Sequence, residues 1–135
     1  MVLPVTAIAT VILGAWYVVL TARVVDARRS AGVSLGDGGD ERLTRRMRGQ
    51  GNFVENVPIA LLVLAVAEMQ TVTTAPTLFT AVLAVAATAL VAGRILHGVA
   101  FCFSDQWIFG RMVGMILTFL SMIALVLLAA LALVL

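Results

Sequence analysis

Three long stretches without a charged residue constrain this chain more than any other feature of its sequence. They are Met1–Ala22, Met69–Gly93 and Met112–Leu135. A helix of about 20 apolar residues crosses the hydrocarbon core of a bilayer, so each stretch is long enough to span a membrane. The chain is 62% hydrophobic, with a mean hydropathy of +1.12. We therefore expect an integral membrane protein, with a permanent first helix because no basic segment precedes it as in a signal peptide.

A fourth membrane helix is predicted between the first two stretches. The apolar run Val57–Met69 is too short to span a bilayer unless its helix continues back through Asn52, Arg48 and Arg45. The second helix is then half polar. The expected fold is all-α, a four-helix membrane bundle that forms a single domain over residues 1–135. Connections between its helices are predicted at Gly32–Asp40, Thr71–Pro76 and Phe103–Gly110.

The basic residues predict an orientation in the membrane. All are arginines, and they lie near the first and third connections: Arg23, Arg28, Arg29, Arg42, Arg45, Arg46, Arg48, Arg94 and Arg111. By the positive-inside rule these two connections are expected in the cytoplasm and both termini on the opposite side. Such a basic face can contact anionic lipid head groups, so nucleic acid is not needed as a partner to explain it. Glu68 is expected to sit alone near the other membrane face, at the interface, where a charge costs little.

The polar half of the second helix points to a binding site. Arg45, Arg48, Asn52 and Glu55 follow steps of three and four residues, so they share one helix face. Charged side chains inside a membrane are costly, and this face must therefore meet another helix, another subunit or a water-filled cavity that holds a polar ligand. A structural alternative stays open at this point. Arg48 could pair with Asp26 or Asp105, while Asn52 holds helices together.

The types of side chain on this face indicate the chemistry of a ligand. Guanidinium groups recognise carboxylates in a bidentate manner, and several together also favour an ionised thiolate. Glu55 has the complementary use of holding an ammonium group. A small zwitterionic peptide carries carboxylates, an amine and amides, and so would match the whole face. The sequence contains no paired His or Cys spacing typical of a metal site, and none is predicted.

The pattern Arg48-x-Gln50-x-Asn52-x-x-Glu55-x-x-Pro58 resembles the signature of the MAPEG family, the membrane-associated proteins in eicosanoid and glutathione metabolism. Three further segments carry the resemblance over nearly the whole chain. Ala27-Arg28-Arg29 looks like the family's paired arginines, and Gly93–Phe101 is similar to its Arg-x-x-His/Tyr-x-x-x-Tyr segment. Arg111 falls within a residue or two of the family's catalytic arginine. The chain is interpreted as a bacterial-type member, located in the inner membrane.

The resemblance implies a homotrimer that holds glutathione between neighbouring subunits, while a lipophilic substrate arrives from the bilayer. Positions that contact glutathione in the family are matched by Arg28, Arg48, Asn52, Glu55 and His97, and more weakly by Gln50. Arg29 or Arg94 would assist the charge balance of the site or protonate a leaving or product oxygen, and Arg94 is counted among the glutathione-binding residues. Arg111 would be catalytic, because it would stabilise the glutathione thiolate.

One departure from the family pattern bears on activity. The tyrosine that often approaches glutathione is Phe101 here, so the contribution of its hydroxyl is missing. The favoured function is a glutathione-dependent membrane transferase or peroxidase. The alternative is a noncatalytic lipid-binding or scaffold protein on the same fold. A small multidrug transporter is disfavoured, since it would be expected to carry a carboxylate in the first helix and Met1–Arg23 has none.

Overall fold

The computed structural model describes residues 3–74, 77–104 and 107–134, which form four helices. Their bounds are α1 Pro4–Ala31, α2 Glu41–Thr74, α3 Thr77–Cys102 and α4 Ile108–Val134. All four are long and apolar enough to cross a membrane. The predicted all-α four-helix membrane bundle is therefore confirmed.

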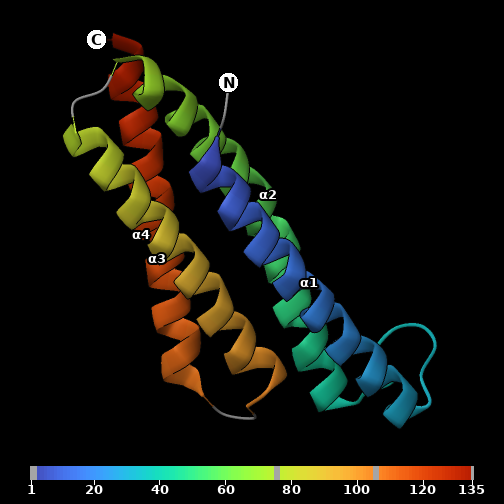
Figure 1. Cartoon of the computed structure of the whole chain (residues 1–135). Coiled ribbons are helices and arrows are strands. Elements are labelled where there is room, and N and C mark those ends of the chain that lie inside the picture. Colours follow the sequence, from blue (N-terminus) through green and yellow to red (C-terminus); the bar gives the residue numbers. More distant parts are fainter. Residues whose placement is uncertain (1–2, 75–76, 105–106, 135) are drawn as a thin grey trace.

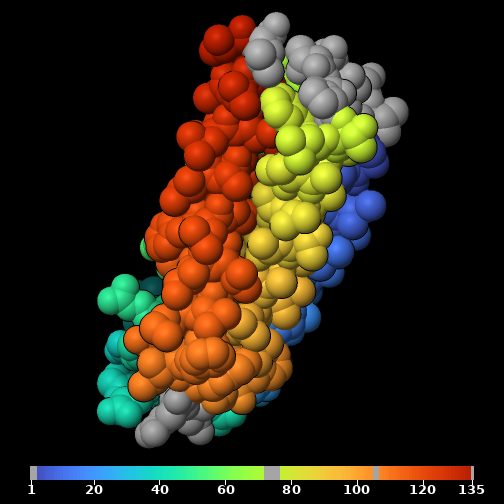
Figure 2. All heavy atoms as spheres, turned by 90° about the vertical axis from the view of Figure 1, so that its left-hand side faces the viewer, coloured from blue at the N-terminus to red at the C-terminus, as the bar shows by residue number. Residues whose placement is uncertain are grey.

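The helices run alternately up and down, so that the start of α1 and the end of α4 lie at one end of the bundle (Figure 1). We call this the terminal end, and we call the opposite end, which holds residues 32–40 and the connection after Cys102, the loop end. Among the described residues α1 packs against α2 and α3, and α4 packs against α3 and α2. Within the described part of the chain α1 and α4 do not pack against each other, because the α2–α3 pair separates them. Figure 2 shows α4 and α3 side by side on one face, with the beginning of α2 projecting beside the lower part of α4.

Local signals explain where the first two helices begin and end. Pro4 occupies the first turn of α1, where its missing N–H costs nothing. Gly32 ends the helix with a left-handed φ of 67°, which glycine adopts without strain. At the start of α2 the Asp40 carboxylate accepts the Leu43 backbone N–H at 2.7 Å. The predicted connection Gly32–Asp40 is thus confirmed.

The other two predicted connections were too long. The turn expected at Thr71–Pro76 was wrong at its start, because α2 continues to Thr74; residues 75–76 lie outside the described residues. The connection expected at Phe103–Gly110 was wrong at its end, because α4 already begins at Ile108. Neither error moves a helix from one face of the bundle to another.

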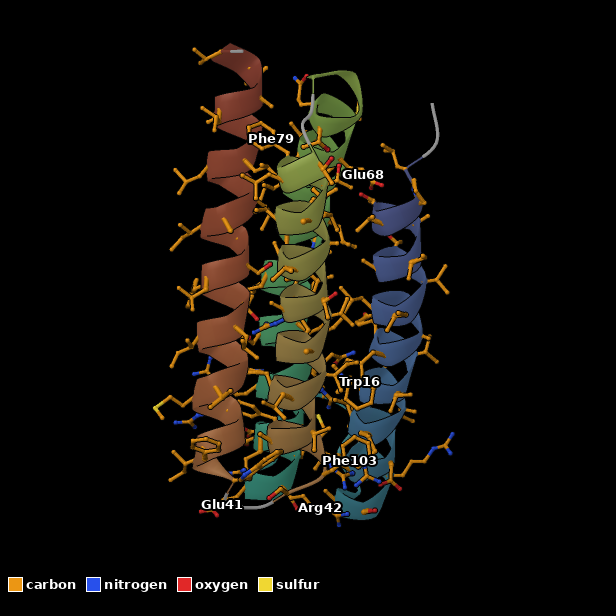
Figure 3. The ribbon with its side chains drawn as sticks, turned by 60° about the vertical axis from the view of Figure 1, so that its left-hand side comes forward. Trp16, Glu41, Arg42, Glu68, Phe79 and Phe103 are labelled. Atoms are coloured by element: carbon orange, nitrogen blue, oxygen red, sulfur yellow. The ribbon has the colours of Figure 1, made fainter. Side chains whose placement is uncertain are left out.

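Glu68 lies at the terminal end, beside the start of α1, but the expectation that it is alone there was wrong. Its side chain is 2% exposed and lies beside the first turn of α1 (Figure 3). The carboxylate accepts the backbone N–H groups of Val5 at 2.9 Å and Thr6 at 2.7 Å, and the Thr6 hydroxyl at 2.6 Å. Leu3, the N-cap residue, supplies no side-chain hydrogen bond. Glu68 therefore caps α1 from the neighbouring helix, which satisfies N–H groups that a helix start leaves unpaired.

Candidate functional site

A polar hollow of about 560 Å³ opens between α2 and α3 towards the loop end. We call it the α2–α3 hollow. Its lining comprises Asp37, Thr44, Met47, Arg48, Gly51, Asn52, Glu55, His97 and Phe101. The volume lies within the range typical of small-molecule sites, about 300–1,000 Å³.

The polar face predicted from α2 forms one wall of this hollow. Arg48, Asn52 and Glu55 all line it, as their spacing of three and four residues requires. Arg48 and Glu55 are exposed on the surface of the chain, so their charges are free to meet a ligand or a neighbouring subunit. Arg45, which was expected on the same face, turns away and donates to the main-chain carbonyls of Ala100 and Ser104.

His97 and Arg94 stand on α3 at the depth of this polar wall. His97 is buried and lines the hollow, with its ring centroid 4.9 Å from that of Phe101. Arg94 is only 1% exposed and does not line the hollow, but its Nη1 donates to the Asn52 side-chain oxygen at 2.9 Å. Its Nε donates to the Thr118 hydroxyl at 2.8 Å. Arg94 thus links α3 to α2 and α4, and it fixes the amide that faces the hollow.

Arg111 lies beside the hollow and contacts one of its lining residues, Phe101. Its guanidinium carbon lies 5.6 Å from the centroid of the Phe101 ring, and that ring lines the hollow. Arg45 approaches the same ring at 6.0 Å. A cation at such a distance from an aromatic face is held by the ring quadrupole. The arrangement leaves the exposed Arg111 beside the hollow rather than inside it.

Two of the predicted glutathione contacts lie outside the hollow. Gln50 donates its side-chain N–H to the Thr21 hydroxyl at 2.8 Å, and it therefore faces α1. Arg28 donates to the carbonyl of Gly36 at 2.8 Å in the first connection. The structure thus brings Arg48, Asn52, Glu55 and His97 together in the hollow. Gln50 faces α1, and Arg28 lies outside the lining but contacts one of its residues, Met47, through a 3.5 Å approach of Nη2 to the sulfur.

Asp37 and Thr44 belong to the hollow although they were not predicted to. The Asp37 carboxylate accepts the Gly39 backbone N–H at 3.1 Å and the Thr44 hydroxyl at 2.9 Å. These hydrogen bonds hold the pKa of Asp37 below its ordinary value, so the group is a carboxylate at neutral pH. Thr44 continues the helical spacing of Arg48 towards the loop, and that spacing was a signal for it. Asp37 comes from a loop, where no periodicity could reveal it.

The structural alternative for the polar face is resolved in part. Asp26 does not pair with Arg48, since its carboxylate lies 2.8 Å from Arg46 and 3.9 Å from Arg23. Asp105, the other proposed partner, lies outside the described residues. Asn52 does hold helices together, through its hydrogen bond with Arg94. The guanidinium of Arg48 makes no ion pair with any residue in the described part of the chain.

The hollow therefore offers a cation, an amide, a carboxylate and an imidazole to one small ligand. In the ranges 3–74, 77–104 and 107–134, no group of three or more His, Cys, Asp or Glu side chains is placed to hold a metal ion. Cys102, the one cysteine of the sequence, is buried.

Comparison with known proteins places the chain in a family. No curated protein matches it. The profile of the MAPEG family matches residues 6–131, which is nearly the whole chain and includes all four helices that form the bundle. The chain therefore belongs to the MAPEG family.

Proposed function

We propose that the protein is a glutathione-dependent membrane transferase or peroxidase. The observation that carries the proposal is the convergence of Arg48, Asn52, Glu55 and His97 on one hollow at the loop end. The MAPEG family contains glutathione transferases and peroxidases as well as noncatalytic members, so membership alone does not decide between them. The chemistry of the hollow favours a peptide thiol.

Each side chain of the hollow has a matching group on glutathione. The Arg48 guanidinium can take a carboxylate in bidentate fashion, and the Glu55 carboxylate can take the ammonium group. Asn52, whose side-chain oxygen is occupied by Arg94, presents its N–H groups to a peptide carbonyl. The His97 ring adds a polar group on the opposite wall. The ligand thus replaces water around the charges that a membrane helix would otherwise expose.

We assign to Arg111 the role of stabilising the thiolate of glutathione. An ordinary thiol has a pKa of about 8.5, and a nearby cation lowers it so that thiolate is present at neutral pH. The thiol proton leaves to solvent, and the thiolate sulfur then forms a bond to the electrophilic atom of a lipophilic substrate. The electron pair of the bond that breaks departs with a leaving group, or moves to the neighbouring atom of an activated double bond, which then takes a proton from solvent. Arg94 contributes positive charge from behind the hollow and positions Asn52.

The assembly and orientation follow as part of the same proposal. We assign the glutathione site to the boundary between subunits of a homotrimer, because Arg28 and Gln50 lie outside the hollow of their own chain. The loop end would face the cytoplasm, since it carries the arginines. The lipophilic substrate would enter from the bilayer, which the apolar outer faces of the helices contact.

The first experiment is a calorimetric titration of the detergent-solubilised protein with glutathione in two buffers of different ionisation enthalpy. We expect saturable binding accompanied by proton release, because the site would bind the thiolate form. Binding without proton release would favour the noncatalytic alternative. Absence of binding would exclude glutathione as the ligand and contradict the proposal.

Variants separate binding from thiol activation. Arg48→Ala and Glu55→Ala should each weaken glutathione binding by ten-fold or more, since each removes a charge-assisted hydrogen bond worth about 1.5–3 kcal/mol. Arg111→Ala should preserve much of the affinity but reduce proton release. Arg42→Ala removes an arginine at the same end of α2 that does not line the hollow, and it serves as the control. Unchanged affinity in both Arg48→Ala and Glu55→Ala would refute the site.

A further inference from the structure

A second cluster of charge lies at the loop end, separate from the α2–α3 hollow. It surrounds a space of about 250 Å³ that we call the arginine pocket. Its lining includes Arg23, Arg42, Arg45, Arg46, Phe103 and Ser104. Among the described residues, Phe101 is the one that lines both the hollow and this pocket. None of the four arginines belongs to the glutathione site proposed above.

Arg46 and Arg23 are held in place by their contacts with the surrounding chain. Arg46 is 3% exposed, and its Nη1 lies 2.8 Å from both the Arg23 carbonyl and the Asp26 carboxylate. Arg23 donates to the Cys102 carbonyl at 3.2 Å and lies 4.6 Å from the centroid of the Phe103 ring. Their guanidinium groups are therefore ordered before any ligand arrives, which lowers the entropic cost of binding.

Arg45 and Arg42 complete the pocket in different ways. Arg45 donates through Nη2 to the Ser104 carbonyl at 3.1 Å, and so it is fixed to the end of α3. Arg42, at the start of α2, is exposed at the loop end (Figure 3). Its side chain makes no hydrogen bond or ion pair within the described residues. Its five N–H donors remain available.

The charges of the pocket are not balanced by the protein. Asp26 is the one carboxylate among the described residues that pairs with these arginines, and its side chain is 55% exposed. Arg23 and Arg45 donate to main-chain carbonyls at the end of α3, so capping of this helix accounts for their presence. A helix C-terminus carries only about half a negative charge, however, and does not balance both of them. Capping does not explain Arg42 or the remaining positive charge, so the cluster is suited to an anion.

The position of the pocket indicates which anion it meets. Arg23 directly follows the charge-free stretch Met1–Ala22, so the pocket lies where the apolar part of α1 gives way to the head-group region. Phe103 and Trp107 are 49% and 38% exposed at this level, as expected for an aromatic belt at a membrane interface. Phosphate groups of lipids occupy this depth, and arginine binds phosphate through paired N–H donors.

We propose that the arginine pocket binds a phosphate group, supplied by an anionic phospholipid at the loop end of the bundle. Bound lipid would tie α1, the start of α2 and the end of α3 together through Arg23, Arg42 and Arg45. This site is independent of the proposed glutathione chemistry, because its arginines do not line the α2–α3 hollow.

The test titrates the detergent-solubilised protein with short-chain phosphatidylglycerol, with short-chain phosphatidylcholine and with inorganic phosphate. The expected result is saturable binding of phosphatidylglycerol and much weaker binding of the other two. Saturable binding of inorganic phosphate without preference for the lipid would support a phosphate site but overturn the lipid as its source. Equal binding of the two lipids, or no saturable binding, would overturn the proposal.

Matched variants locate the binding. Arg42→Gln should weaken phosphatidylglycerol binding by about ten-fold or more, because it removes a charge-assisted contact without breaking a hydrogen bond of the fold. Arg29→Gln removes an exposed charge near the end of α1 that does not line the pocket, and should cost at most about five-fold through diffuse electrostatics. Equal losses in the two variants would show that the lipid responds only to overall charge, and would refute the pocket.

Discussion

Phe101 is the side chain on which the candidate chemistry depends most directly. Its ring lines the α2–α3 hollow, packs against His97 and lies 5.6 Å from the guanidinium carbon of Arg111. The ring can hold this arginine through its quadrupole, but it offers no hydroxyl to a sulfur atom. In the proposed function, thiol activation would therefore depend on positive charge alone at this position.

Phe101→Tyr is expected to increase thiolate formation. The added hydroxyl would donate to a thiolate in the hollow, and a hydrogen bond to the charged form lowers the thiol pKa. Proton release on glutathione binding at neutral pH should rise towards one per site. Phe103→Tyr adds the same hydroxyl in the arginine pocket, outside the hollow, and should leave proton release unchanged. An equal response of both variants would mean that Phe101 does not face the sulfur.

The contact between α3 and α4 depends on two glycines that face each other. A Cβ atom added at Gly114 would lie 2.7 Å from the carbonyl oxygen of Gly93 and 2.7 Å from the backbone nitrogen of His97. Real Cβ atoms do not approach backbone atoms so closely, so the two helices would have to separate. Close approach through small residues is a common way for membrane helices to pack.

Gly114→Ala should therefore destabilise the bundle, by about 1–3 kcal/mol as for other overpacked sites. It should also weaken glutathione binding, because the displaced α3 carries His97 out of position. Gly14→Ala is the matched control, since nothing lies within 4 Å of a Cβ added on that exposed part of α1. Because alanine has a higher helix propensity than glycine, Gly14→Ala should raise the free energy of unfolding by up to about 1 kcal/mol. Thermal unfolding in detergent measures the stability of both variants. A Gly114→Ala variant as stable as the unchanged protein would contradict the close contact.

The start of α1 depends on a carboxylate from α2. Glu68→Gln keeps the shape of the side chain but removes the charge that accepts from Val5 and Thr6. The expected cost is about 1.5–3 kcal/mol, with faster hydrogen exchange of these two amides. Glu41→Gln makes the same change at an exposed position in the first turn of α2 and should have little effect. Equal exchange in both variants would refute the capping role.

These elements show what the sequence could and could not predict. The four helices and the face of Arg48, Asn52 and Glu55 follow from local spacing and from the length of charge-free stretches, and they were predicted correctly. The environment of Glu68 was not predicted correctly, because it depends on which turn of α1 packs beside this residue. The contact of Arg94 with Asn52 likewise depends on the register between α2 and α3, which no local pattern records.

The positions of Arg28 and Arg48 relative to the hollow bear on how the subunits assemble. Arg48 lines the hollow, whereas Arg28 lies outside it and is held by the first connection. If both contact glutathione, as the proposed function requires, the trimer that we propose assigns Arg28 to the hollow of a neighbouring subunit. A closed ring of such head-to-tail contacts is the arrangement expected of a trimer.

Co-expression of Arg28→Ala and Arg48→Ala subunits tests this arrangement. Each variant alone should bind glutathione weakly, since every site lacks one arginine. With equal amounts of the two variants, random assembly should restore both arginines at about a quarter of all subunit boundaries, which is roughly one boundary in each mixed trimer. A titration should then resolve a minor class of sites with wild-type affinity. If both arginines served the hollow of their own chain, no mixed assembly could contain an intact site, and the absence of this class would refute a shared site.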